Sequence, residues 1–168
     1  MAPDRLKRTF LAVELPHEVK QVAIQLQTTV EAKPKVVKWV KAANIHLTLR
    51  FIGPTPEEEM PKINAAVAGA VKGYRDIKLR VNGTGVFPKP QRPRILWLGV
   101  EGDVEPLREL VTAINGALNE MGYPAEERLY TPHITIARIK YPQKVTPDVT
   151  TFLNCEYEPV DVSVENVK

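Results

Sequence analysis

The sequence predicts an α+β fold with mainly antiparallel sheets, organised as two similar lobes. Strand-like and helix-like segments alternate along the 168 residues, but their spacing does not repeat a regular strand–helix–strand unit. The segment Gly83-Thr84-Gly85 is too weak a pattern for a P-loop or a dinucleotide-binding turn. One four-residue element occurs at 46–49 and again at 133–136, about half the chain length later, which indicates an internal duplication.

The first half of the chain is expected to contain three strands and two helices. A proline near the first helical position begins one helix at Leu15-Pro16, and the acids Glu57, Glu58 and Glu59 complement the dipole at the start of the other. The apolar stripe of the first helix comprises Val22, Ile24, Leu26 and Val30. The predicted strands are 8–14, 36–40 and 45–52, the helices are 15–33 and 57–72, and the turn is 53–56.

The rest of the chain is expected to contain four strands and two helices. Gly122 ends the longer helix in the usual C-terminal position. A segment rich in glycine and proline predicts a loop over 82–93. The predicted strands are 76–81, 94–100, 133–139 and 157–164, and the predicted helices are 106–121 and 146–153.

Composition predicts a globular protein with one domain over residues 1–168. The chain is 43% hydrophobic and 26% charged, and its net charge of +3 is too small to require a polyanionic partner. Cys155 is the single cysteine, so a disulfide framework is excluded, and no neighbouring motif would activate its thiol. No apolar run approaches the ~20 residues of a membrane span, and no signal-peptide pattern begins the sequence. A cytoplasmic protein without a membrane partner is therefore expected.

The repeated element places catalytic residue types on one face of a strand. It reads His-Leu-Thr-Leu at 46–49 and His-Ile-Thr-Ile at 133–136. Because side chains alternate along a strand, histidine and threonine share one face while the aliphatic residues enter a core on the other. Two such strands that face each other across a pseudo-twofold axis would bring two imidazoles and two hydroxyls into one cleft.

That set of groups suits phosphoryl transfer without a metal ion. A histidine has an ordinary pKa of ≈ 6.5, so near neutral pH one imidazole can act as base and the other as acid. Threonine hydroxyls can donate hydrogen bonds to the non-bridging phosphate oxygens. A single His-x-Thr is usually structural, but paired copies at half-chain spacing favour catalysis. His17, at the start of a helix, is predicted to be a surface residue.

The chain resembles the two-histidine (2H) phosphoesterase superfamily, and within it the RNA 2′,3′-cyclic phosphodiesterase family, also called 2′-5′ RNA ligase. The resemblance extends over nearly the whole chain, through RTFLAVELP, VKWVKAANIHLTLRFIG, RPRILWLGV and ERLYTPHITIAR. It implies two lobes, each an antiparallel sheet with outer helices, around a central active-site cleft. The implied activity is hydrolysis of an RNA 2′,3′-cyclic phosphate end to a 2′-phosphomonoester, in some members with 2′-5′ ligation. The substrate would be RNA with such an end, tRNA fragments included. No metal, cofactor or obligate protein partner is implied.

The resemblance also assigns roles that the residues themselves leave open. It makes His46 the proton donor and His133 the proton acceptor, while Thr48 and Thr135 would hold the phosphate. The two elements look equivalent in sequence, so the choice between acid and base rests on the resemblance alone.

Two arginines near the motifs are candidates for substrate binding. Arg50 has the parity of His46 and Thr48, so a regular strand would turn it into the cleft, where it could pair with a phosphate or lie as a charge at the rim. Arg138 has the opposite parity to His133, so only a bulge or a strand end near Ala137 would bring it round.

Other candidates have weaker signals. Arg92 and Arg94 flank Pro93 and could contact RNA phosphates, although surface solvation explains them almost as well. Tyr130 and Phe10 could pack or stack on bases, and Trp97 is expected in the core.

Two other functions compete with a cyclic phosphodiesterase. A binding module could use the same cleft to hold a nucleotide or an RNA end without turnover. A metal-dependent hydrolase is disfavoured, because three histidines without an HExxH helix or a His-x-His pair supply few ligands.

Overall fold

The computed structural model describes residues 6–32, 35–74, 76–125, 129–141 and 146–164. In this part of the chain the strands form two sheets, and every strand pair is antiparallel. The smaller sheet pairs β1 (Leu6–Glu14) with β3 (His46–Pro56). The larger sheet has the order β2 (Val37–Trp39), β6 (His133–Ile139), β5 (Ile95–Gly102), β4 (Ile77–Phe87) and β7 (Val160–Val164). The predicted α+β class is confirmed.

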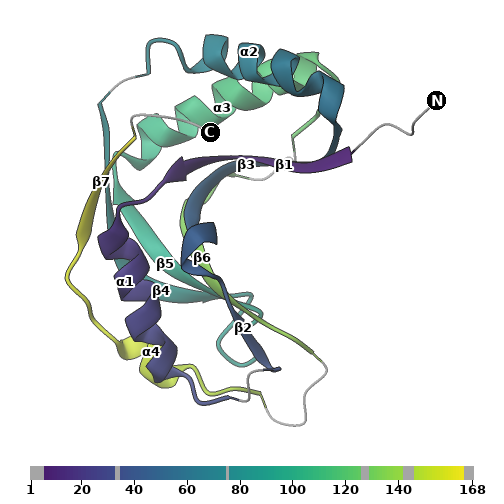
Figure 1. Cartoon of the computed structure of the whole chain (residues 1–168). Coiled ribbons are helices and arrows are strands. Elements are labelled where there is room, and N and C mark those ends of the chain that lie inside the picture. Colours follow the sequence, from purple (N-terminus) through teal and green to yellow (C-terminus); the bar gives the residue numbers. More distant parts are fainter. Residues whose placement is uncertain (1–5, 33–34, 75, 126–128, 142–145, 165–168) are drawn as a thin grey trace.

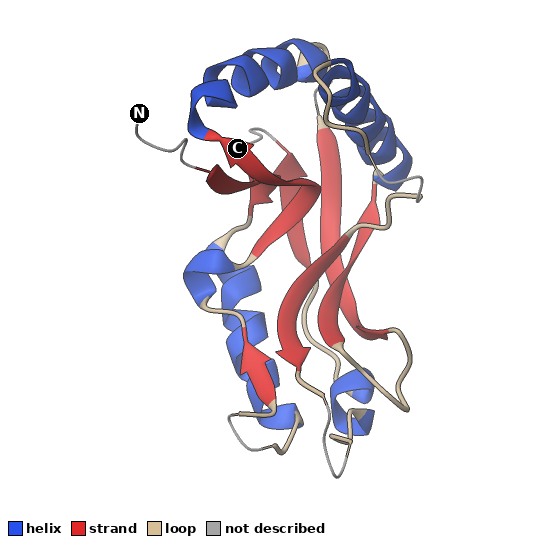
Figure 2. Ribbon diagram, turned by 90° about the vertical axis from the view of Figure 1, so that its right-hand side faces the viewer, coloured by secondary structure: helices blue, strands red, loops and turns tan. Residues whose placement is uncertain are grey.

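The helices lie on the outer side of a crescent. Figure 1 shows α2 (Met60–Val71) and α3 (Val104–Glu120) over β1 and β3, with α1 (His17–Leu26) and α4 (Thr150–Asn154) outside the larger sheet. Figure 2 shows the same division from the side, with two groups of helices at opposite ends and the strands between them. The concave side of the crescent is therefore formed by strands.

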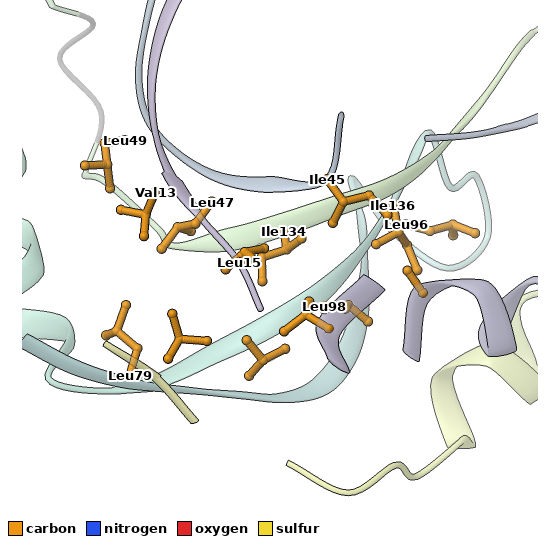
Figure 3. Packing of buried hydrophobic residues seen from close by; sticks show 14 of the residues in the cluster. Val13, Leu15, Ile45, Leu47, Leu49, Leu79, Leu96, Leu98, Ile134 and Ile136 are labelled. Atoms are coloured by element: carbon orange, nitrogen blue, oxygen red, sulfur yellow. The ribbon is translucent and has the colours of Figure 1, made fainter. Parts of the chain in front are cut away.

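One aliphatic cluster joins the two sheets. Leu47 and Leu49 from β3 lie in the same buried group as Ile134 and Ile136 from β6 (Figure 3). Buried residues of every helix complete the cluster, among them Val19 of α1, Ile63 of α2, Ile114 of α3 and Phe152 of α4. Because burial of such side chains contributes ≈ 1.5–3 kcal/mol each, this cluster fixes how the two motif strands lie against each other.

Two predicted breaks in the strands are wrong. Residues 53–56 continue β3 instead of forming a turn, and residues 82–87 continue β4 instead of beginning a loop. The prolines at 54 and 56 are tolerated because β3 pairs with β1 alone in the described part of the chain, and an edge strand does not need every N–H group. The strand β4 accommodates Gly83 in a register shift between Val81 and Thr84, and Gly85 then pairs regularly with Trp97.

Several predicted element ends also differ. The helix α1 ends at Leu26 and continues as a 3₁₀ turn over 27–29, and Ile24, predicted to face the core, is 52% exposed. The last helix begins at Thr150 and not at residue 146. Residues 142–145, which precede the predicted start, lie outside the described residues. The last strand begins at Val160 and pairs with β4. No helix within the described ranges is long and apolar enough to cross a membrane.

Candidate active site

The two repeated elements each begin a strand at the histidine, and the two strands are in contact. β3 starts at His46 and β6 starts at His133. The aliphatic residues of both elements are buried, whereas both histidines and both threonines are partly or fully exposed. Strand alternation therefore turns the imidazoles and hydroxyls of both elements away from the aliphatic cluster, toward the concave side.

A β-bulge follows the threonine in both elements. In β3 the pairing moves from Ala12↔Thr48 to Leu11↔Arg50, which leaves Leu49 as the extra residue. In β6 it moves from Thr135↔Trp97 to Ala137↔Leu96, with Ile136 as the extra residue. A bulge puts two successive side chains on one side, so the sixth residue of each element, and not the fifth, returns to the face of the histidine.

The predicted orientation of Arg50 is wrong for this reason. The bulge pairs Arg50 with buried Leu11 and turns its side chain to the helix side. There its guanidinium donates hydrogen bonds to Oδ1 of Asn115 at 2.9 Å and to the carbonyl oxygens of Tyr123 and Pro124 at 3.0 and 3.1 Å. These hydrogen bonds connect β3 to α3 and to the segment that follows it. They favour a structural role over the predicted phosphate contact.

Arg138 lies on the face of His133, because β6 has the bulge near Ala137 that this orientation requires. Ala137 is fully buried beside Ile136, and the next side chain, Arg138, is exposed on the other face of β6. Arg138 therefore shares the face of His133 and Thr135. The equivalent position in the first element is Phe51, five residues after His46, and sequence reasoning did not single it out.

His46 lies between an aromatic ring and a pair of opposite charges. The Phe10 ring stacks on the imidazole, with 5.0 Å between centroids and 18° between planes. A pocket of ≈ 430 Å³ beside it is lined by Phe10, Glu14, Lys20 and His46 among others. Burial and the positive charge of Lys20 lower the pKa of His46, whereas Glu14 acts in the opposite direction. The net shift makes the imidazolium of His46 a stronger acid.

His133 is oriented by a backbone carbonyl and by two aromatic rings. Its Nδ1 lies 2.8 Å from the carbonyl oxygen of Thr131. Since a carbonyl can only accept, Nδ1 carries the proton, and the lone pair of the neutral ring is on Nε2. The Phe87 ring meets the imidazole edge-on at 5.0 Å, and the Trp97 ring is at 6.3 Å. An imidazole held in this way can accept a proton at Nε2.

The prediction that Trp97 is a core residue is wrong. Trp97 pairs with Thr135 across the sheet and is only partly buried, so its indole lies on the face of His133. It covers Gly85 of β4, where an added Cβ atom would lie only 2.0 Å from the indole ring. The Trp97 and Phe87 rings are themselves 5.2 Å apart. Glycine at 85 leaves the space that this aromatic pair needs beside His133.

Tyr130 joins the segment before the second element to the first element. Its hydroxyl donates to the carbonyl oxygen of Thr48 at 2.8 Å, and its own carbonyl accepts from Nε of Arg108 at 2.9 Å. Burial raises the pKa of the Tyr130 phenol, so the hydroxyl remains a donor. One hydrogen bond therefore connects the backbone of Thr48 to the segment that precedes His133. A direct substrate contact of Tyr130 stays a prediction.

The two remaining arginine candidates lie beside one aromatic ring. Arg92 and Arg94 are both exposed and lie 4.5 and 5.8 Å from the centroid of the Tyr141 ring. His17 is exposed at the start of α1, as predicted. Among the described residues no group of three His, Cys, Asp or Glu side chains could hold a metal ion.

Comparisons with known proteins agree on one family. Residues 11–168 match the 2′-5′ RNA ligase superfamily. A protein from Methanothermobacter thermautotrophicus named RNA 2′,3′-cyclic phosphodiesterase is 32% identical over 164 residues, which cover 96% of this chain and 88% of that protein. A protein of the same name from Thermotoga maritima is 32% identical over 165 residues, which cover 96% and 84%.

Solved structures show the same fold. A crystal structure of a Thermus thermophilus protein has a TM-score of 0.73 at 29% identity and covers 96% of this chain and 86% of that one. Escherichia coli LigT, solved in complex with 3′-AMP, has a TM-score of 0.63 at 23% identity and covers 86% and 80%.

The charges beside His46 predict opposite pKa shifts in two variants. We expect Lys20→Met to raise the pKa of His46, because a cation that disfavours the imidazolium is lost. We expect Glu14→Gln to lower it, because the opposing anion is lost. Burial is the largest cause of the lowered pKa, and neither substitution is aimed at it. An NMR titration of the His46 ring checks this, with His17 as the internal control. Shifts of the same sign in the two variants would contradict the assignment.

The contacts of Arg50 predict a stability role that Arg138 lacks. We expect Arg50→Met to lower the free energy of unfolding by about 2 kcal/mol, because a charged donor loses three acceptors on the α3 side. The matched variant Arg138→Met removes an exposed guanidinium and should stay within about 0.5 kcal/mol of wild type. Urea denaturation measures both. Equal losses in the two variants would show that Arg50 does not anchor β3.

Proposed function

The chain belongs to the 2′-5′ RNA ligase superfamily, and from this premise we propose that it hydrolyses a 2′,3′-cyclic phosphate at an RNA end to a 2′-phosphomonoester. The observation that carries the proposal is the pair of bulged strands β3 and β6, which turn His46, Thr48, His133 and Thr135 toward the concave side. Two relatives named for this activity, each matched over most of its length, support the same reaction.

The proton acceptor in this reaction is His133. Its Nδ1–H is held by the carbonyl of Thr131, so Nε2 is free of a proton in the neutral ring. Nε2 takes a proton from water as the water oxygen attacks phosphorus. The backbone contact then stabilises the imidazolium, because a carbonyl oxygen remains hydrogen-bonded to its Nδ1–H.

The proton donor is His46. As the bond between phosphorus and the ribose 3′ oxygen breaks, the electron pair goes to that oxygen, which takes a proton from the His46 imidazolium. One proton thus enters at His133 and one leaves from His46, and the product carries a 2′-phosphate and a 3′-hydroxyl. The lowered pKa of His46 suits the donor, because a stronger acid transfers its proton more readily to the leaving oxygen.

The hydroxyls of Thr48 and Thr135 donate to the non-bridging phosphate oxygens, where negative charge increases in the transition state. Arg138, on the face of His133, supplies a positive charge to the same group. The chain's own groups therefore provide acid, base and anion stabilisation. RNA ending in a 2′,3′-cyclic phosphate, tRNA fragments included, is the substrate class. With a 5′-hydroxyl in place of water as the attacking group, the two histidines would keep these roles in 2′-5′ ligation and would exchange them in the reverse cleavage of that linkage.

Removal of either motif histidine is expected to abolish turnover. We expect His46→Ala and His133→Ala each to lower kcat/KM on RNA ending in a 2′,3′-cyclic phosphate by at least about 100-fold, the usual contribution of a positioned proton-transfer group. His17→Ala is the matched control, because it removes the exposed third histidine on α1, and should equal wild type. The assay is end-group analysis of the RNA, with and without a 5′-hydroxyl acceptor and after exhaustive chelation.

Each outcome has a distinct meaning. A 2′-phosphate product that both motif variants fail to form supports the mechanism, provided that circular dichroism shows them folded. Near wild-type turnover in either variant would contradict the two-histidine mechanism. Unchanged RNA ends with measurable affinity would favour the binding module, and loss of turnover on chelation would favour a metal-dependent hydrolase.

A further inference from the structure

The carbonyl oxygen of Thr48 belongs to the peptide bond that begins the bulge of β3. Leu49, the next residue, is the extra one in the pairing with β1. A bulge locally disrupts the ladder of hydrogen bonds, so backbone groups there are stabilised by a partner from elsewhere. The partner in this chain is a side chain, because the hydroxyl of Tyr130 donates to the Thr48 carbonyl at 2.8 Å.

Tyr130 is itself held by the helix α3. Nε of Arg108 donates to the Tyr130 carbonyl at 2.9 Å, and the Arg108 side chain is only 26% exposed and forms an ion pair with Glu105. Burial raises the pKa of the Tyr130 phenol, so the hydroxyl keeps its proton and remains a donor. Tyr130 therefore connects α3 to the first motif, and it stands three residues before the histidine of the second motif.

The Tyr130 hydrogen bond is directional, whereas the packing behind the two motifs is not. The aliphatic residues of both motifs lie in one buried cluster (Figure 3). Hydrophobic contact brings the two strands together but has no preferred direction. A hydrogen bond weakens steeply as its angle departs from linear. The Tyr130 hydroxyl is therefore the contact suited to fix where Thr48 stands relative to the strand that begins at His133.

The proposed chemistry depends on that relative position. In phosphoryl transfer the attacking and leaving oxygens lie roughly in line through phosphorus, so the two histidines must stand on opposite sides of one phosphate. A misplacement of about 1 Å can lower the rate of such a reaction about 100-fold. A contact that fixes the position of one motif against the other therefore contributes to kcat more than to substrate binding.

We propose that the Tyr130 hydroxyl is a positioning group, which sets the relative position of the two motifs through the Thr48 carbonyl. This inference rests on the proposed function and adds to it a residue that the reaction needs without contact to the substrate. The role takes the place of a direct phosphate contact, because the phenol has one proton and donates it to Thr48. The non-bridging oxygens of a cyclic phosphate can only accept, so they would have to displace that bond.

Removal of the Tyr130 hydroxyl tests the role, and the chain supplies a matched control. The hydroxyl of Tyr157 also donates to a distant backbone carbonyl, that of Gly83, at 2.7 Å, and burial raises its pKa as well. We expect Tyr130→Phe to lower kcat on a 2′,3′-cyclic mononucleotide about tenfold and to keep KM within about twofold. Tyr157→Phe loses the same kind of bond and should keep both constants within about twofold. Urea denaturation should show similar midpoints for the two variants.

Arg108 gives a second route to the same contact. Arg108→Met releases the carbonyl of Tyr130 but leaves its hydroxyl, so it should lower kcat in the same direction. Because both substitutions weaken one connection, the double variant should be slower than Tyr130→Phe by no more than about twofold, whereas independent effects would multiply. Multiplied effects would contradict a shared connection.

The results separate this inference from the proposed function. If wild type does not turn over the cyclic nucleotide, the proposed function fails and this inference fails with it. If wild type is active and Tyr130→Phe keeps its kcat, or Tyr157→Phe loses as much, the inference alone is overturned. A raised KM at unchanged kcat, together with weaker inhibition by inorganic phosphate, would also overturn it and would assign Tyr130 to a direct phosphate contact.

Discussion

The structure depends on the two-residue alternation of the strands β3 and β6, each interrupted by a bulge just after its motif threonine. The same short element must bury two aliphatic side chains in the shared cluster and present a histidine and a threonine to the concave side. A slip of one residue in register would exchange these faces and lose both the core and the site. Packing thus fixes the chemistry, because the aliphatic cluster cannot form unless both imidazoles lie on the opposite side.

The two histidines differ in their surroundings although their motifs look equivalent. Burial and Lys20 act on His46, while a backbone carbonyl and two aromatic rings orient His133. This asymmetry gives a physical reason for one to donate a proton and the other to accept one. Tyr130 ties the two halves together, since its hydroxyl reaches the backbone of the first motif from the segment before the second.

The sequence alone was sufficient for the features that follow from periodicity. The paired motifs, the α+β class and the strand at 133–139 could be predicted, because each depends on local alternation. The orientation of Arg50 could not, because a bulge is set by how two strands pair and leaves no mark in one strand's pattern. Trp97 was misplaced for a related reason. Its position depends on Gly85 in a neighbouring strand, which offers the indole a space beside His133.

The central claim is that both motifs act on one phosphate from the same concave surface. A crystal structure with a uridine–vanadate complex tests it most directly, because the vanadium adopts the five-coordinate geometry of the hydrolytic transition state. The account predicts the imidazoles of His46 and His133 within hydrogen-bond distance of the two apical oxygens, and the hydroxyls of Thr48 and Thr135 on the equatorial ones. A vanadate bound by one histidine alone, with the other directed elsewhere, would contradict it.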